Sequence, residues 1–381
     1  MSDKSKNNLF KFSPNRRQVV KGTAAIAGAA ALGRFIPRAR AAEGETLTML
    51  TWPGHVTPHV VGPFEERTGI KIIAKEYVGG EEMMSLLQQS PPGTYDVILT
   101  GNAYVEQALA GGFIEEMDPA DYPIDDFWPE FQKFPTLWYD DKLYSVMIGY
   151  GFIGMAYNTE AFTPKEVSSY DVLWSEKAKG RLGHFDWFLP SMGVLSLYNG
   201  NPSPYDIDEA TYQKMKETLF SLAPQDPNFY AFSGLFPALT GGDVHVVPGI
   251  GEWLTILMQK DGIPLAMSLP EEGGLQWTEA LSIGKGTTKR DLVVEFIQYY
   301  SSPEGLVRES TKEAYASSSP SIAAWKKLNE ERPADAAALR HQFDKPNVID
   351  DIRNGLIHTR IQPVQQLGET WGEAWTEYKT L

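Results

Sequence analysis

Short apolar runs alternate with amphipathic stretches in the first part of the chain after residue 45. Runs that are apolar throughout predict strands, whereas apolar residues spaced three or four apart predict helices. The predicted order is strand 46–52, helix 63–68, strand 70–77, helix 81–89, strand 95–100 and helix 103–110. Gly69 and Gly111 follow two of the helical stretches, where glycine commonly ends a helix. Strands that alternate with helices imply a parallel sheet with crossover helices, and therefore an α/β fold.

A second alternating region begins near residue 145. It predicts strands at 145–158, 183–188, 244–249 and 265–269. Together the two regions predict two lobes whose chain crosses between them more than once, with a ligand cleft at the join. We assign residues 42–150 and 278–320 to the first lobe, and residues 151–277 and 321–381 to the second. The crossing segments near 149–154 and 277–282 are the predicted hinges.

Two loops of the first region are candidate parts of a binding site. Ligands of open α/β sheets bind beyond the carboxyl ends of the strands. Trp52 and His55 lie in the loop after the first predicted strand, and residues 100–103 follow the third. We expect these two loops to meet at one edge of the sheet.

The first 41 residues are predicted to be an export signal rather than part of the fold. Residues 16–17 are a twin-arginine pair, residues 23–33 are mildly apolar, and residues 39–41 (Ala-Arg-Ala) match a signal-peptidase site. The apolar run is too short for a bilayer, which needs about 20 apolar residues. We therefore expect export by the twin-arginine machinery, cleavage after Ala41 and a periplasmic location. The alternative is a disordered basic arm.

The chain is acidic, and its charge limits the class of partner. Its 381 residues include 49 Asp and Glu against 34 Lys and Arg, which gives a net charge of −15. This charge disfavours nucleic acid and anionic membranes and favours neutral or cationic solutes. The chain has no Cys, so disulfides and cysteine lipidation are excluded. We expect a monomer that is free in the exported compartment.

Motifs for catalysis and cofactor binding are absent from the sequence. It has no cysteine nucleophile, no Gly-x-Ser-x-Gly elbow, no zinc-protease motif and no dinucleotide-binding glycine motif. His55 and His59 are four positions apart, but Pro58 between them disfavours a zinc pair. We therefore predict no enzyme, and neither a metal nor a cofactor. An exported hydrolase with Asp186 and Glu279 as an acid–base pair is the alternative from another class.

Aromatic residues next to carboxylates are the chemistry that stands out. Phe, Trp and Tyr make up 12% of the chain, and Trp187 and Trp277 each lie within two positions of an acidic residue. Aromatic faces attract an ammonium group, and carboxylates form charge-assisted hydrogen bonds with it. This combination indicates recognition of an organic amine.

Four segments carry a likeness to a known family. They are residues 50–55 (Leu-Thr-Trp-Pro-Gly-His), 64–72, 95–105 and 270–279 (Pro-Glu-Glu-Gly-Gly-Leu-Gln-Trp-Thr-Glu), the last being the most specific. They resemble the periplasmic solute-binding proteins of ABC importers, specifically the spermidine/putrescine-binding branch. The resemblance implies the two-lobed type II periplasmic-binding-protein fold, with each lobe a mainly parallel sheet flanked by helices. It also implies ABC permease subunits of the inner membrane as partners.

The resemblance assigns ligand-binding roles to particular residues. It implies that Trp52 and Trp277 form aromatic walls around a methylene chain. Asp186 matches a family carboxylate that holds an amino group, and Glu279 stands where the family usually has Asp. Tyr315 matches a late aromatic residue of the pocket.

Several positions depart from the family pattern. His55 stands in place of a loop Tyr, and Leu189 falls where a second carboxylate is expected. A family Trp falls near Gly251, with Glu252 and Trp253 beside it as candidate substitutes. The far end of the pocket is therefore altered.

The favoured ligand is a polyamine or a related small organic amine, captured by closure of the lobes. Because one expected carboxylate is missing, a zwitterion or amino-acid derivative stays open. A ferric ion would need several converging Tyr ligands, and the sequence offers only the adjacent pair at 299–300.

Overall fold

The computed structural model describes residues 44–381, so the predicted signal at 1–41 lies outside the described residues. The strands are β1 (Thr46–Thr51), β2 (Lys71–Glu76), β3 (Val97–Gly101), β4 (Trp138–Tyr139), β5 (Lys142–Leu143), β6 (Val146–Asn158), β7 (Gly183–Phe185), β8 (Asn228–Tyr230), β9 (Val246–Gly251), β10 (Leu265–Ser268), β11 (Gly274–Ile283) and β12 (Ile357–Thr359).

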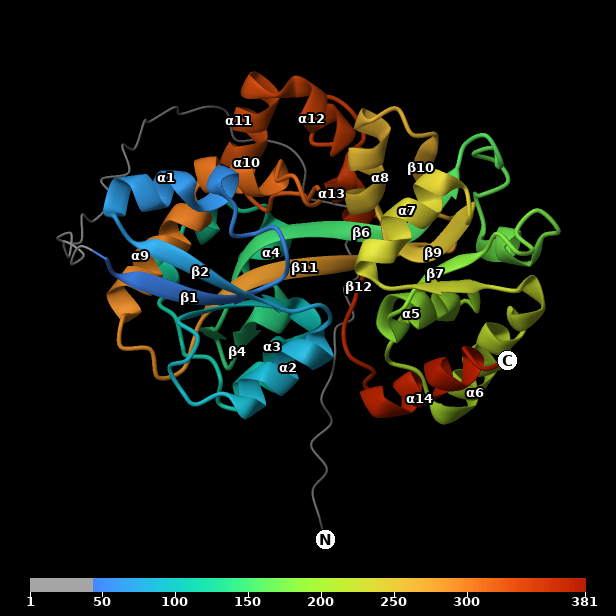
Figure 1. Ribbon diagram of the computed structural model, residues 1–381, viewed down its shortest axis with the longest axis horizontal. Coiled ribbons are helices and arrows are strands. Elements are labelled where there is room, and N and C mark those ends of the chain that lie inside the picture. The colour runs from blue at the N-terminus through green and yellow to red at the C-terminus, as the bar shows by residue number, and fades with distance from the viewer. Residues whose placement is uncertain (1–43) are drawn as a thin grey trace, which may run out of the picture. The chain divides into compact units, whose positions relative to one another are not determined.

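The same residues form fourteen α-helices (Figure 1). They are α1 (Pro58–Thr68), α2 (Gly80–Gln89), α3 (Val105–Ala110), α4 (Pro129–Gln132), α5 (Phe188–Tyr198), α6 (Glu209–Phe220), α7 (Phe232–Gly241), α8 (Glu252–Lys260), α9 (Arg290–Tyr300), α10 (Pro303–Ser310), α11 (Ile322–Glu331), α12 (Pro333–Ala338), α13 (Val348–Arg353) and α14 (Gly368–Tyr378). In this part of the chain, no helix combines the length and the apolar character that a membrane crossing requires.

Helix α1 begins five residues before the predicted start at Pro63. Thr57 caps it by accepting a hydrogen bond from the Val60 amide, and proline is well suited to the first turn that follows. Pro63 lies inside the helix, where its missing N–H leaves the carbonyl of His59 without a helical donor. Arg308 donates to that carbonyl at 3.2 Å, which compensates for the proline.

The main sheet has eight strands and is mixed. β1 pairs in parallel with β2 and β3, as the alternation of strands and helices predicted. β11 is antiparallel to both β3 and β6, and β9 and β10 are antiparallel to β6. Parallel pairing is therefore found among β1, β2 and β3, between β11 and β12 and, outside this sheet, between β7 and β8, whereas the pairs made by β6 are antiparallel. Because β11 is antiparallel to both β3 and β6, β6 runs in the same direction as β1, β2 and β3. The strands that run the other way are β9, β10, β11 and β12.

Strands β6 and β11 run side by side through the middle of the molecule (Figure 1) and are buried along nearly their whole length. The predicted hinge segments lie opposite each other on them, with Gly151 paired to Trp277 and Gly149 paired to Glu279. The register shifts between Glu279 and Ala280, and such a bulge bends a strand locally. Residues 44–381 belong to one compact unit, so the lobe boundaries remain a prediction.

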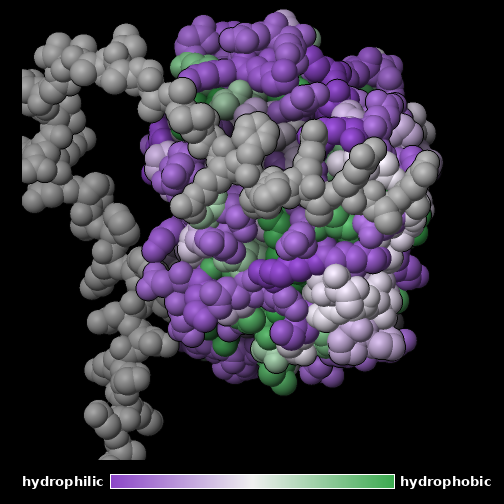
Figure 2. Space-filling model, turned by 90° about the vertical axis from the view of Figure 1, so that its left-hand side faces the viewer, coloured by the Kyte–Doolittle hydropathy of each residue, from purple (hydrophilic) through white to green (hydrophobic). Residues whose placement is uncertain are grey.

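The predicted strand 183–188 is shorter than expected. β7 ends at Phe185, and α5 begins at Phe188. β7 pairs in parallel with β8 outside the main sheet. On the other side of the molecule, α1 and α9 face solvent, and this side is largely hydrophilic (Figure 2).

Candidate ligand-binding site

A cavity of about 90 Å³ lies beyond the ends of β1, β3 and β9 and along β11. Nearly half of its lining residues are aromatic, namely Trp52, Tyr77, Tyr104, Phe185, Trp187, Phe232, Trp253, Trp277 and Tyr315. Charged groups reach it from two positions, Glu279 on β11 and Arg360 just after β12. The cavity is therefore an aromatic chamber with one acidic and one basic side chain.

Strand β11 presents two of the lining side chains. Trp277 and Glu279 are two positions apart, so both project from one face of the strand. A Cβ atom built at Gly151, the partner of Trp277, would lie 2.6 Å from the indole ring and 2.3 Å from Oε1 of Glu252. Only glycine leaves room there for the indole and the carboxylate, which explains Gly151.

Glu279 has one oxygen bonded and the other free. Its Oε1 accepts a 2.7 Å hydrogen bond from the hydroxyl of Tyr315. Its Oε2 is buried and has no hydrogen-bond partner among the described residues, although Nε2 of His55 is 3.5 Å away. The side chain of Glu279 lines the cavity and is 11% exposed, so its carboxylate is an acceptor that a donor on a ligand can approach.

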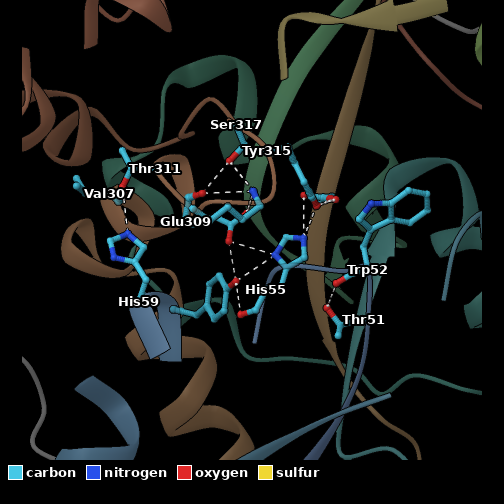
Figure 3. Close-up of polar contacts among 12 residues, drawn as sticks. Thr51, Trp52, His55, His59, Val307, Glu309, Thr311, Tyr315 and Ser317 are labelled. Atoms are coloured by element: carbon cyan, nitrogen blue, oxygen red, sulfur yellow. Dashed lines mark hydrogen bonds and ion pairs between the residues drawn. The ribbon is translucent and has the colours of Figure 1, made fainter. Parts of the chain in front are cut away.

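A buried polar network lies behind Glu279 and Tyr315 (Figure 3). Nε2 of His55 is 2.5 Å from the hydroxyl of Tyr315, and Nδ1 is 3.1 Å from Oε2 of Glu309. Glu309 also accepts 2.7 Å hydrogen bonds from the hydroxyl of Tyr300 and the ammonium of Lys312. Because Tyr315 donates to Glu279, we assign the proton between His55 and Tyr315 to Nε2 of the imidazole.

The charges of this network stabilise one another. Burial disfavours a charged His55, but the carboxylates of Glu309 and Glu279 outweigh it and raise the pKa of the imidazole above its usual value. Burial alone would raise the pKa of Glu309, but His55 and Lys312 hold it well below its usual range. The network therefore fixes the hydroxyl of Tyr315, and through it the carboxylate of Glu279, at the cavity wall.

The same cluster contains residue types that can ligate a metal ion. His55, Glu279 and Glu309 place possible ligand atoms within 4.8 Å of one another. However, the ammonium of Lys312 is already bonded to Glu309 and supplies the positive charge that a metal would bring. The hydrogen-bonded arrangement favours a positioning role for the cluster.

Residues 59–338 match the sequence model of the family described as bacterial extracellular solute-binding protein. The chain belongs to this family. The match spans most of the described residues, including β11 and the loop that carries Tyr315.

Relatives of this solute-binding protein include polyamine-binding proteins. A spermidine/putrescine-binding periplasmic protein of Salmonella typhimurium is 27% identical over 314 residues, which cover 80% of this chain and 85% of the relative. A putrescine-binding periplasmic protein of Escherichia coli is 22% identical over 365 residues, which cover 89% of this chain and 93% of the relative.

A solved structure with a similar fold is a spermidine/putrescine ABC transporter substrate-binding protein from Streptococcus pneumoniae. Its TM-score is 0.71 at 18% identity, and the likeness covers 88% of this chain and 99% of that one. This likeness confirms the predicted type II periplasmic-binding-protein fold.

The fold brings five of the predicted site residues together around the cavity of this solute-binding protein. They are Trp52, Trp253, Trp277, Glu279 and Tyr315. They come from the end of β1, the start of α8, the middle of β11 and a loop after α10. Their contact with a ligand remains a prediction, but they are placed where it requires them.

Two predicted residues, His55 and Glu252, lie behind the lining instead of in it. His55 is fully buried in the polar network. Both carboxylate oxygens of Glu252 accept from the amide of Phe152, and burial raises the pKa of Glu252 to about 8. The prediction that these two side chains touch the ligand is not supported, because Tyr315 covers His55 and Trp277 packs beside Glu252.

Asp186 is the predicted residue that the fold places elsewhere. Its carboxylate accepts hydrogen bonds from Nε1 of Trp375 at 2.9 Å and from Nζ of Lys379 at 2.5 Å. It lines a separate open depression beside α14. Asp186 is thus paired within the protein, and the acid–base pair with Glu279 that a hydrolase would need does not form in one cavity.

Arg360 is the lining residue that the sequence analysis missed. It follows the three-residue strand β12, whose pairing with β11 brings it to the cavity. Its backbone amide donates to Gln276 at 3.0 Å, and Asn102 donates to its carbonyl at 2.7 Å. A lone arginine in an irregular C-terminal segment carries no local signal of such a position, so only the tertiary contacts reveal it.

Proposed function

We propose that this solute-binding protein captures a small organic amine, the class to which polyamines belong, and delivers it to an ABC permease. The observation that carries the proposal is the carboxylate of Glu279, which lines an aromatic cavity and has one oxygen without a hydrogen-bond partner in the described structure. An ammonium group that leaves water needs a carboxylate partner. Aromatic faces around it add cation–π attraction.

The relatives support the same class of solute. Both curated relatives named above are described as binding putrescine, alone or with spermidine. Both are also described as periplasmic, and the solved structure is described as part of an ABC transporter. The aromatic residues of the cavity and Glu279 give this chain the chemistry for a related solute.

Closure about β6 and β11 is the proposed mechanism of capture. The cavity is lined from both ends of these long strands, by Trp52 and Tyr77 on one side and by Phe232 and Trp253 on the other. A hinge at the bulge beside Glu279 would open and close this lining around the solute. The closed form is the one that a permease would recognise.

Export by the twin-arginine route places the protein in the periplasm. Replacing Arg16 and Arg17 together by Lys should leave the uncleaved precursor in the cytoplasm, as measured by cell fractionation and the mass of the product. Replacement of Lys21 by Arg is the matched control and should leave export intact. Export of the double variant at the normal rate would refute this route.

The binding proposal is tested by thermal melting of the purified protein after carried-over solute has been removed. A ligand of the native state alone raises the melting temperature by mass action. We expect a shift with one or more small amines that is lost in Glu279→Gln and kept in the control Glu66→Gln, whose side chain is exposed. A shift that persists in Glu279→Gln would overturn the proposed role of this carboxylate.

A further inference from the structure

Arg360 is a buried cation with no anion of its own. The residue is only 7% exposed and lines the cavity. Its guanidinium lies over the ring of Trp187, with Cζ 4.7 Å from the centroid. Among residues 44–381, Nε of Arg360 has no hydrogen-bond acceptor.

This guanidinium stays charged. Burial lowers its pKa, and the tyrosines and carboxylates around it only partly oppose that effect. An arginine nevertheless keeps its proton in proteins. Removing a charge from water costs several kcal/mol unless an opposite charge and hydrogen bonds compensate. The described side chains do not supply that compensation, so the site is incomplete without an anion.

Two further donors in the same cavity also lack acceptors. Nε1 of Trp187 and Nε1 of Trp277 are buried without a hydrogen-bond partner in the described part of the chain. Both indoles line the cavity together with Arg360. In the described structure the lining residues therefore carry three buried donor atoms without acceptors, whereas Oε2 of Glu279 is the one buried acceptor atom among them without a donor. An ammonium ion offers donors only, so a polyamine provides no acceptor for the guanidinium of Arg360.

Gly101 places the two charges near each other without joining them. It pairs with Glu279 across β3 and β11, and a Cβ built on it would lie 3.9 Å from Nη2 of Arg360. Gly101 therefore lies within van der Waals distance of the guanidinium. Glu279 and Arg360 thus share one wall of the cavity and form no direct ion pair in the described structure.

We propose that the solute is a short amino acid, with its ammonium group held by Glu279 and its carboxylate held by Arg360. This inference rests on the proposed function, because it keeps the amine at Glu279. It narrows the solute from small organic amines in general to those that also carry a carboxylate. A carboxylate accepts bidentate hydrogen bonds from a guanidinium. The second ammonium of a diamine would instead face the guanidinium and be repelled by it.

The size of the cavity agrees with a short solute. A cavity needs roughly 10–15 Å³ to hold one water molecule. A cavity of about 90 Å³ therefore has room for roughly six to nine water-sized groups. This suits a short amino acid better than a long triamine.

The test compares four solutes of equal carbon number by calorimetry and thermal melting. They are γ-aminobutyrate with both charges, putrescine with two ammonium groups, butylamine with one ammonium, and butyrate with one carboxylate. The inference predicts that γ-aminobutyrate binds at least about 10-fold more tightly than putrescine. If the site fits a chain that is one carbon shorter or longer, the same ratio is expected between that amino acid and the diamine of equal length.

Arg360→Gln is the decisive variant. It should weaken binding of the amino acid by about 10-fold to 100-fold and leave the monoamine unchanged or improved. Arg360→Lys keeps the charge but loses the bidentate geometry, so intermediate affinity is expected. If Arg360→Gln does not fold, the comparison of the four solutes on the unaltered protein still decides.

The outcomes separate the two proposals. Tighter binding of the diamine series, or an unchanged preference in Arg360→Gln, overturns this inference and leaves the amine function standing. Binding of butyrate as tight as that of the amino acid, together with no effect of Glu279→Gln, overturns the amine function. No binding by any amine or amino acid of the series overturns both.

Discussion

The indole ring of Trp52 packs edge-on against the phenyl ring of Phe232, with ring centroids 5.8 Å apart and ring planes at 89°. Trp52 follows β1, whereas Phe232 begins α7. Phe232 also stacks on Trp253, with centroids 5.6 Å apart. These aromatic contacts join elements from opposite ends of the long strands β6 and β11 across the cavity.

Replacing Phe232 by Ala should weaken solute binding about 10-fold, because it removes the ring that joins Trp52 to Trp253 in the closed cavity. Calorimetric titration with whichever solute binds the unaltered protein measures this. Phe343→Ala is the matched control, since that ring is 47% exposed and lies outside the lining. Equal affinities of the two variants would show that the contact does not contribute to closure.

Replacing Lys312 by Met should lower the free energy of unfolding by about 3–5 kcal/mol. The reason is that Glu309, which is fully buried, would lose its ammonium partner at 2.7 Å. Urea denaturation measures the change. Lys327→Met is the control, because its pair with Glu331 is exposed and such pairs contribute at most about 1 kcal/mol. Similar losses in the two variants would contradict the importance of the buried network.

Tyr315→Phe should lower the free energy of unfolding by about 1–3 kcal/mol, because buried partners on both sides lose a hydrogen bond. The hydroxyl contacts Nε2 of His55 and donates to Oε1 of Glu279. Tyr122→Phe is a close control, since that hydroxyl is buried without a partner in the described structure. The prediction fails if urea denaturation gives the two variants the same stability.

Glu252→Gln should make stability less dependent on pH between about 4.5 and 8. Burial raises the pKa of folded Glu252 from 4.5 to about 8, so in this range the folded protein keeps a proton that the unfolded chain has released. Stability therefore falls as pH rises, by up to about 1.4 kcal/mol per pH unit, and the glutamine variant lacks this contribution.

The Glu252→Gln variant is needed because the titration of His55 also lowers stability as the pH rises. Its pKa is raised too, so the stability that it contributes at low pH is lost as pH rises through its folded pKa. Denaturation of Glu252→Gln and of the exposed control Glu160→Gln across this pH range separates the two residues. If the free energy of unfolding changed with pH in the same way in both variants, Glu252 would not have the raised pKa.

Local patterns in the sequence were enough to predict the type of fold and part of the site. The alternation of strands and helices gave the parallel pairing of β1, β2 and β3. The spacing of Trp277 and Glu279 on one strand placed both on the same face. These predictions worked because hydrophobic periodicity and strand geometry depend on neighbours along the chain.

The tertiary structure decided which charged groups are free to meet a solute. Asp186 looked available in sequence, yet α14 brings Lys379 and Trp375 to it from the C-terminus. Arg360 had no sequence signal, yet the pairing of β12 with β11 brings it into the cavity. A charge is available only when no distant segment neutralises it, and the pattern of residues around it does not specify those long-range partners.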